Sequence, residues 1–407
     1  MFRSPSRFLT AAVVIVVTNA FLNACGSNNS SDNSSGPVLL AATLSLTGPL
    51  GAIGNPQQAG YQQLVDDLNA AGGIQIGGAR RELTLQTLDN RSDPTTATQQ
   101  ASELALKDNA AVLLGSCTPP INQPLAQFAD KNKVPFLTSC EPLGAFRSDA
   151  PASGWKYSWV FHFDERDQAR VLIKAAILAQ TDKKIAVFTD NEADGVIQRQ
   201  LFKQYAGELG FTVVGDYTFP VGQSDFSSFI ADAKNKQADV VVGQMTPPDG
   251  VALVKQMKSA RYNPRVLSVA KAADTSSWLD GLGSLADGTV HNGFWTPDPS
   301  VPQTKALNDT FTKKFHDHAS VGLAVAAYSA AQVAADAISR AGSIDPDKVN
   351  ASIGTSTLHT PFAAVKFSPD HTSKTPVTAE QWQKGATHQV FPQIPGITMH
   401  SPPPGLQ

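Results

Sequence analysis

Short apolar runs alternate with amphipathic stretches along most of this chain, and the pattern is clearest in residues 109–143. There the runs Ala110–Leu114 and Val134–Leu137 are bounded by Gly, Pro and polar residues and flank a helical stretch. Continuous apolar runs of this length are typical of strands buried on both faces of a parallel sheet. A right-handed crossover would set these strands side by side or nearly so, with the loops that follow them at the carboxyl edge, where open α/β sheets bind ligands.

Cys117 and Cys140 each follow one of these two strands. Neighbouring strands lie about 4.8 Å apart, and a disulfide needs Cα atoms about 5.5 to 6 Å apart. The geometry therefore permits a bridge across the rim of a pocket, with a pair of free thiols as the alternative. Neither cysteine has a histidine close in sequence that could activate it as a nucleophile.

The same alternation occurs in two series, which predicts two doubly wound open sheets and hence two α/β lobes. In the first series, a helix carries Tyr61, Leu64, Val65 and Leu68 on one buried face, and a second helix begins at Asp93-Pro94 as an N-cap and N1 pair. The strands of the second series are predicted at residues 184–189, 212–219, 239–243 and 265–269.

Two extended aromatic segments and an Ala-rich helix at 321–341 indicate where the chain crosses between the lobes. The small side chains of that helix predict its burial. Crossings near residues 161, 288 and 342 would form a three-crossover hinge. The predicted lobes are then residues 38–160 plus 288–342 for lobe 1 and residues 161–287 plus 343–400 for lobe 2.

The amino terminus has the layout of a secretion signal: Arg3 and Arg7 precede an apolar run at residues 8–17 and then Leu22-Asn23-Ala24-Cys25. The run is shorter than the ~20 apolar residues that span a bilayer. Residues 22–25 resemble the lipobox of bacterial lipoproteins, which implies a signal peptide at 1–24 and a lipidated Cys25. The alternative is an ordinary signal peptide that leaves a third, free cysteine.

Residues 26–36 are low in complexity and nearly free of apolar groups, so 25–37 is predicted to be a lipidated cysteine and a flexible linker. Cleavage would leave 407 − 24 = 383 residues, enough for two domains. The formal charge of −3 argues against a nucleic-acid partner. The prediction is an extracytoplasmic protein held at a membrane by its lipid without spanning it.

Motifs of nucleotide-binding and catalytic proteins are missing from the sequence. The Gly-rich loop at 47–54 lacks the GxGxxG and GxxxxGK[ST] spacings, and HExxH, GxSxG and CxxC do not occur. In His316-Asp317-His318 the two histidines are two residues apart and do not share a helical face, which favours a solvated surface over a metal site. We therefore predict neither an enzyme nor a cofactor.

The order and spacing of several short motifs resemble the type I periplasmic solute-binding proteins of ABC importers, in particular the leucine/isoleucine/valine-binding family. These motifs are Leu46–Gly51, Asn69–Ile74, Asp89 with Asp93-Pro94, Phe226–Ile230 and Gly288–Val290. The resemblance implies a ligand held between two closing lobes and presented to ABC permease and ATPase subunits. An envelope sensor or accessory protein with the same fold, but without transport, is the alternative.

The resemblance also implies a ligand site at the two facing carboxyl edges. The candidates are Thr118, Asn122, Ser139 and Glu141 in lobe 1 and Asn191, Asp194, Gln244 and Lys271 in lobe 2.

Three positions depart from the family pattern: Pro120 stands near an expected serine, Asp194-Gly195 replaces a tyrosine-glycine pair, and Lys271 stands where an acidic residue is common. The departures argue against a branched-chain ligand and leave an amino acid or another small organic acid, aromatic ones included. Lys271 is expected to meet a ligand carboxylate, with Asp194 or Glu141 at an amine or hydroxyl. Lys271→Ala would then weaken binding without lowering stability. The alternative is that Asp194 and Lys271 only cap helices or pair on the surface.

Overall fold

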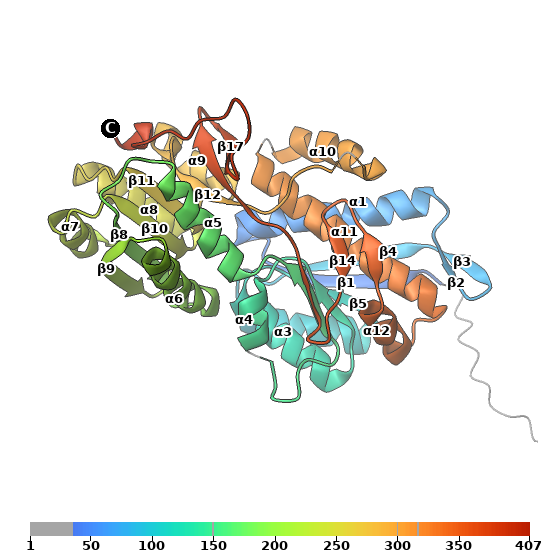
Figure 1. The fold of residues 1–407 in the computed structure, drawn as a ribbon. Coiled ribbons are helices and arrows are strands. Elements are labelled where there is room, and N and C mark those ends of the chain that lie inside the picture. The colour runs from blue at the N-terminus through green and yellow to red at the C-terminus, as the bar shows by residue number, and fades with distance from the viewer. Residues whose placement is uncertain (1–35, 149, 299, 316) are drawn as a thin grey trace, which may run out of the picture. The chain divides into compact units, whose positions relative to one another are not determined.

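The computed structural model describes residues 36–148, 150–298, 300–315 and 317–407. Two sheets account for most of the strands, and helices flank each of them (Figure 1). The predicted signal peptide, the lipidation site Cys25 and the linker up to residue 35 lie outside the described residues, as does His316.

The first sheet has six strands in the order β15-β7-β6-β5-β1-β4, and every neighbouring pair is parallel. Its strands are β1 (Val38–Leu44), β4 (Leu83–Asp89), β5 (Val112–Leu114), β6 (Phe136–Thr138), β7 (Ser158–His162) and β15 (Thr372–Lys374). The helices of this lobe are α1 (Gly51–Ala70), α2 (Pro94–Ser102), α3 (Pro119–Asn132), α4 (Leu143–Ser148), α10 (Pro302–Phe315), α11 (His318–Ala341) and α12 (Pro346–Gly354). Because β5 and β6 are buried along their whole length, they match the continuous apolar runs of the sequence.

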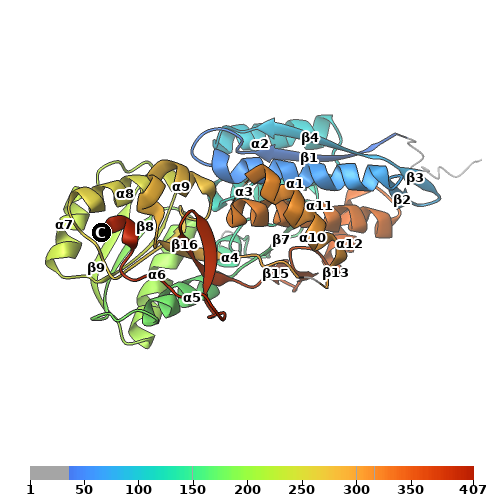
Figure 2. The ribbon, with the colours of Figure 1, turned by 90° about the horizontal axis from the view of Figure 1, so that it is seen from above.

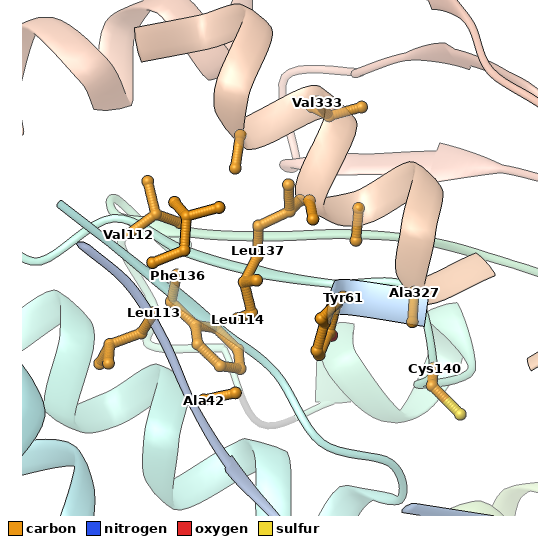
Figure 3. Packing of buried hydrophobic residues seen from close by; sticks show 14 of the residues in the cluster. Ala42, Tyr61, Val112, Leu113, Leu114, Phe136, Leu137, Cys140, Ala327 and Val333 are labelled. Carbon is orange, nitrogen blue, oxygen red and sulfur yellow. The ribbon is translucent and has the colours of Figure 1, made fainter. Parts of the chain in front are cut away.

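Helices α1 and α11 pack side by side on this sheet (Figure 2). Gly60 permits their close approach, since a Cβ there would lie 2.0 Å from the carbonyl oxygen of Ala324. Figure 3 shows the core beneath them, where Tyr61 lies beside Ala327 and close to Leu114 and Leu137 of the strands. The Tyr61 hydroxyl donates to the carbonyl of Gly115 (2.7 Å), so the one polar atom of this side chain is satisfied.

Helix α11 is long and apolar enough to cross a membrane by composition alone. However, 89% of its most apolar window is buried inside the protein. The predicted burial of the Ala-rich helix is thereby confirmed, since Ala and other small residues let neighbouring elements approach on several sides of it.

The second sheet has seven strands in the order β17-β16-β12-β11-β10-β8-β9. The strands are β8 (Lys184–Asp190), β9 (Thr212–Phe219), β10 (Val240–Met245), β11 (Val266–Lys271), β12 (Val290–Gly293), β16 (Thr378–Gln383) and β17 (Ala386–Phe391). Its helices are α5 (Glu165–Ile177), α6 (Ala193–Glu208), α7 (Ser227–Asn235), α8 (Pro247–Ser259) and α9 (Ser276–Leu282). The pairs from β9 to β12 are parallel, whereas β12–β16 and β16–β17 are antiparallel.

Small elements complete the chain. They are β2 (Ile74–Ile76), β3 (Ala79–Arg81), a π-helix (Glu103–Lys107), a 3₁₀ turn (Gly283–Ala286), β13 (Thr357–His359), β14 (Ala364–Lys366) and a second 3₁₀ turn (Pro404–Leu406).

Strand pairing corrects two of the predicted crossings. Strand β12 still belongs to the second sheet, so the second crossing follows residue 293 and not 288; Phe294 and Trp295 then enter the core of lobe 1. Strand β15 pairs with β7 of the first sheet, so the third crossing lies between β15 and β16 and not near 342. Helix α12 stays in lobe 1 because it packs on α11. The first crossing follows β7, next to the predicted residue 161.

Glu165 joins the two lobes at the first crossing. It is the first residue of α5, and its carboxylate accepts from the backbone N–H groups of Gly144 (2.6 Å) and Ala145 (2.7 Å) in α4. Burial raises the pKa of Glu165 to about 7, although these two hydrogen bonds favour the ionised form. At the base of the hinge, Glu165 therefore binds a proton more readily than an exposed glutamate does.

Candidate ligand-binding pocket

A pocket with about 490 Å³ of empty space lies where the carboxyl ends of the two sheets face each other. Elements of both lobes and of the crossings line it. The lining residues are Ile53, Cys117, Thr118, Cys140, Pro142, His162, Phe163, Gln168, Asp194, Gln244, Lys271, Asp274, Thr275, Phe294 and Leu323. The empty space includes a part that is open to solvent. The placement of the pocket is that of a ligand site in an open α/β fold.

Lobe 1 forms a mostly apolar wall around the disulfide Cys117–Cys140, whose Cα atoms are 4.8 Å apart. The bridge ties the loop after β5 to the loop after β6, as the sequence permitted. Thr118 follows with φ 72°, a conformation rare for a β-branched residue. Its N–H donates to the carbonyl of Cys140 (3.2 Å), and its hydroxyl has no hydrogen-bond partner among the described residues.

Aromatic side chains from the crossings form the floor of the pocket. His162 packs against Phe163, with ring centroids 4.2 Å apart, and against Phe294, at 5.7 Å. Burial lowers the pKa of His162 to about 3, so the ring is neutral at physiological pH. The floor therefore offers an uncharged aromatic surface.

Lobe 2 forms a charged wall around Lys271, the last residue of β11. Its ammonium lies 3.6 Å from Asp190 Oδ2 and 3.4 Å from Asp194 Oδ2, and it also contacts Glu192 Oε2 directly. Asp190 ends β8, and Asp194 lies in the first turn of α6, so the cluster lies at the carboxyl edge of the sheet. Like Thr118, Lys271 has a positive φ, 64°. Such strained residues are concentrated at ligand sites.

The cluster has three carboxylates for one ammonium. Burial would lower the pKa of Lys271, but the charges of Asp190, Asp194 and Glu192 outweigh burial and hold this pKa well above its ordinary value. Burial raises the pKa of Asp190 to about 7 and raises the pKa of Glu192, against the opposing effect of Lys271. Lys271 is therefore a permanent cation within an acidic wall.

Several buried acceptor atoms of this wall have no hydrogen-bond donor among the described residues, and two of them belong to one bonded pair of side chains. Gln244 Nε2 donates to Asp194 Oδ2 (2.7 Å), which leaves Gln244 Oε1 and Asp194 Oδ1 unsatisfied although both side chains are only 2% exposed. A buried acceptor without a donor costs about 1 to 3 kcal/mol. A hydrogen-bond donor bound in the pocket could satisfy such atoms.

Carboxylate oxygens of Asp190, Glu192 and Asp194 lie within 4.8 Å of one another, a spacing that could hold a metal ion. The ammonium of Lys271 lies against all three, however, and supplies the positive charge at this position. The arrangement is therefore that of a buried ion-pair cluster.

Residues 37–387 match the family described as "Periplasmic binding protein". The matched range covers most of the 407 residues. The chain belongs to this family. More narrowly, the comparisons show a type I periplasmic binding protein of the leucine/isoleucine/valine-binding group, with the two-lobed α/β fold predicted from the sequence.

One curated relative is the leucine-, isoleucine-, valine-, threonine- and alanine-binding protein of Pseudomonas aeruginosa. It is 25% identical over 356 residues, which are 86% of this chain and 91% of the relative.

Solved structures share the fold. The leucine-binding protein LivK of Thermotoga maritima has a TM-score of 0.76 at 22% identity and covers 86% of this chain and 97% of its own. A solute-binding protein of an ABC transporter from R. palustris, in complex with benzoate, has a TM-score of 0.72 at 17% identity and covers 87% and 96%.

In this periplasmic binding protein, four of the eight predicted ligand residues line the pocket: Thr118, Asp194, Gln244 and Lys271. The structure gives the ammonium of Lys271 three acidic partners. The predicted contact of Lys271 with a ligand carboxylate stays a prediction.

The other four predicted residues are not among the described lining residues. Asn122 is buried and braces the loop instead: its side chain accepts from the N–H of Ser116 (3.0 Å) and donates to the carbonyl of Ser116 (3.0 Å). Ser139 and Glu141 are buried, and Asn191 is exposed.

Several lining residues were not predicted, among them Gln168, Asp274, Phe294 and Leu323. Gln168 and Leu323 lie within helices, where a core position and a pocket position look alike in sequence. Asp274 could have been found from its place three residues after the end of β11. It lies 3.6 Å from His291, and burial raises its pKa.

Proposed function

We propose that this protein is the extracytoplasmic solute-binding component of an ABC importer, anchored to the membrane by a lipid on Cys25. The observation that carries the proposal is a pocket walled by the carboxyl edges of two sheets on opposite sides of a three-crossover hinge. A ligand there contacts both lobes, so binding favours the closed arrangement over the open one.

Relatives support this assignment. The similar proteins bind amino acids by name, and one of the similar structures is a transporter component that holds benzoate. We infer by analogy that the ligand here is likewise a small organic molecule, taken up through permease and ATPase subunits.

Uptake by cells tests the proposal. A strain without the gene should lose saturable uptake of the ligand, and wild-type protein should restore it. If the purified protein binds the ligand but uptake is unchanged in the deletion strain, the protein is a sensor or accessory protein and the importer role is wrong.

Site variants connect uptake to the pocket. Thr118→Val in lobe 1 and Gln244→Met in lobe 2 remove polar groups from opposite walls and should each weaken binding. Ser259→Ala is the matched control because its hydroxyl bonds within α8 and is exposed, away from the lining residues. Weakening by only one of the two wall variants would contradict a ligand held between the lobes.

A further inference from the structure

We propose that the pocket selects a ligand with a positively charged hydrogen-bond-donor head, an amine or amidine, on a compact apolar body, and that it disfavours a carboxylate. The inference rests on the proposed function, since it names the class of solute that the same pocket takes. It departs from the relatives, whose ligands are amino acids or an aromatic acid.

Positive charge in the wall is already neutralised. Lys271 is the one lysine or arginine among the described lining residues, and its ammonium faces Asp190, Glu192 and Asp194. An ammonium has three N–H donors, so three carboxylates can use all of them. A ligand carboxylate would have to displace one of these acids and would be repelled by the others.

Among the lining residues of lobe 2, the unpaired buried atoms are acceptors, whereas the unpaired Thr118 hydroxyl in lobe 1 can donate or accept. Asp194 Oδ1 and Gln244 Oε1 both lack donors among the described residues, and they come from side chains that hydrogen-bond to each other. A ligand ammonium could donate to both atoms and would also reduce the net negative charge of the cluster. A carboxylate could donate to neither.

Two helices that follow strands at this edge lack their first N–H donors, the groups through which helix N-termini often bind anions. Helix α3 follows β5 and starts Pro119-Pro120; helix α8 follows β10 and starts Pro247-Pro248. Proline has no N–H, so the first two positions of both helices cannot donate. The N–H of Thr118, just before α3, is already bonded to Cys140.

The remaining wall suits an apolar body. Ile53, Phe163, Phe294 and Leu323 line it together with the disulfide. Uncharged His162 adds an aromatic face beside Phe163 and Phe294. Burial of an aliphatic or aromatic group here is favourable by about 25 cal/mol per Å² of apolar surface.

Ligands matched in their apolar body separate the contribution of each head group. One series is isoamylamine, leucine and isocaproate; the other is phenethylamine, phenylalanine and hydrocinnamate. In each series the first has only the amine, the second has both groups and the third has only the carboxylate. Calorimetry and thermal shift should be run on the mature protein, with its disulfide intact, in mildly alkaline buffer.

At least one amine should bind at least tenfold more tightly than its amino acid, and the acid of the same series should not bind. An amino acid or acid that binds as tightly as its amine would overturn the donor-head inference and leave the solute-receptor function standing. If none of the compounds binds even at millimolar concentration, both the inference and the proposed function are contradicted for solutes of this size.

Charge variants of the wall provide a second, independent readout. Asp194→Asn should weaken amine binding at least tenfold and narrow the difference between amine and acid. Asp216→Asn is the matched control: Asp216 lies on β9 and pairs with Arg199 and Lys203, away from the lining residues. Equal amine affinity in wild type and Asp194→Asn would remove the acidic wall from recognition and overturn the inference.

Discussion

The two walls of the pocket differ in the interactions that hold their loops at the edge of the sheet. Lobe 1 uses a covalent bridge and apolar packing: Cys117 is bonded to Cys140, and Asn122 braces the same loop through neutral hydrogen bonds. Lobe 2 uses a buried cluster of three acidic side chains around Lys271. Because a neutral wall has no long-range preference for ligand charge whereas an acidic one does, we expect lobe 2 to discriminate between ligand charges.

The largest expected effect is on the charged wall. Lys271→Met leaves three buried carboxylates without their cation, and breaking a buried ion pair in this way costs roughly 3 to 5 kcal/mol. Denaturant unfolding should show that loss in the empty protein. Lys203→Met, which removes a partly exposed partner of Asp216, should cost less than about 1 kcal/mol. The sequence alone suggested that loss of the Lys271 charge would spare stability, so an unchanged unfolding midpoint would favour that simpler interpretation.

Removal of the disulfide in lobe 1 should give the next largest loss of stability. The disulfide spans 23 residues, and closing a loop of this length stabilises by about 3 kcal/mol in the chain-entropy model. The double variant Cys117→Ala/Cys140→Ala should therefore melt at a lower temperature while keeping the preference of lobe 2 for amines. If a thiol reagent labels both cysteines quantitatively in the native, unreduced protein, the bridge is not formed and this prediction is wrong.

Glu165, which connects the two lobes at the first crossing, should make the stability of the protein depend on pH. Burial raises the pKa of Glu165 from 4.5 to about 7, so the folded state holds this proton more tightly than the unfolded state does. The stability from this group is complete below pH 4.5 and is lost as pH rises through 7. The loss is at most about 3 kcal/mol.

Glu165→Gln removes this titration. Relative to wild type, the variant should gain stability as pH rises from about 5 to about 8, as followed by melting temperature. Asp167→Asn is the control, because Asp167 is a half-buried neighbour on α5 that pairs with Lys374. A difference between Glu165→Gln and wild type that is constant with pH would contradict the raised pKa.

Removal of the proposed lipid anchor should have the smallest effect on the stability of the two walls and on ligand binding. Cys25→Ser should release the protein from the membrane fraction and leave its melting temperature and ligand affinity unchanged, because the linker carries no apolar groups for a core. Fractionation followed by immunoblotting measures the release. Membrane retention equal to wild type would exclude the lipid on Cys25.

The sequence was sufficient for the framework because apolar runs record burial directly. The runs at 110–114 and 134–137 became β5 and β6, and the two cysteines after them came together. It was insufficient for the later crossings, since β12 and β15 are short and their sheet is decided by pairing with strands far away in sequence.

The charged wall could be predicted only in part. Asp194 and Lys271 were recognised as strand-end charges, but the sequence does not show that they face each other. Strands β8 and β11 both flank β10, so the carboxylates and the ammonium meet only once the strand order is known. For Asn122, the side chain turns back to Ser116 instead of toward the pocket, a choice that residue type does not reveal.

Hydrogen exchange with and without saturating ligand tests most directly whether the solute is held between the two walls. Binding should slow exchange both in the loop of lobe 1 around Cys117 and Thr118 and in the segment of lobe 2 from Lys271 to Thr275, with the same dependence on ligand concentration. Protection confined to one lobe, or centred on a surface away from both segments, would contradict the account.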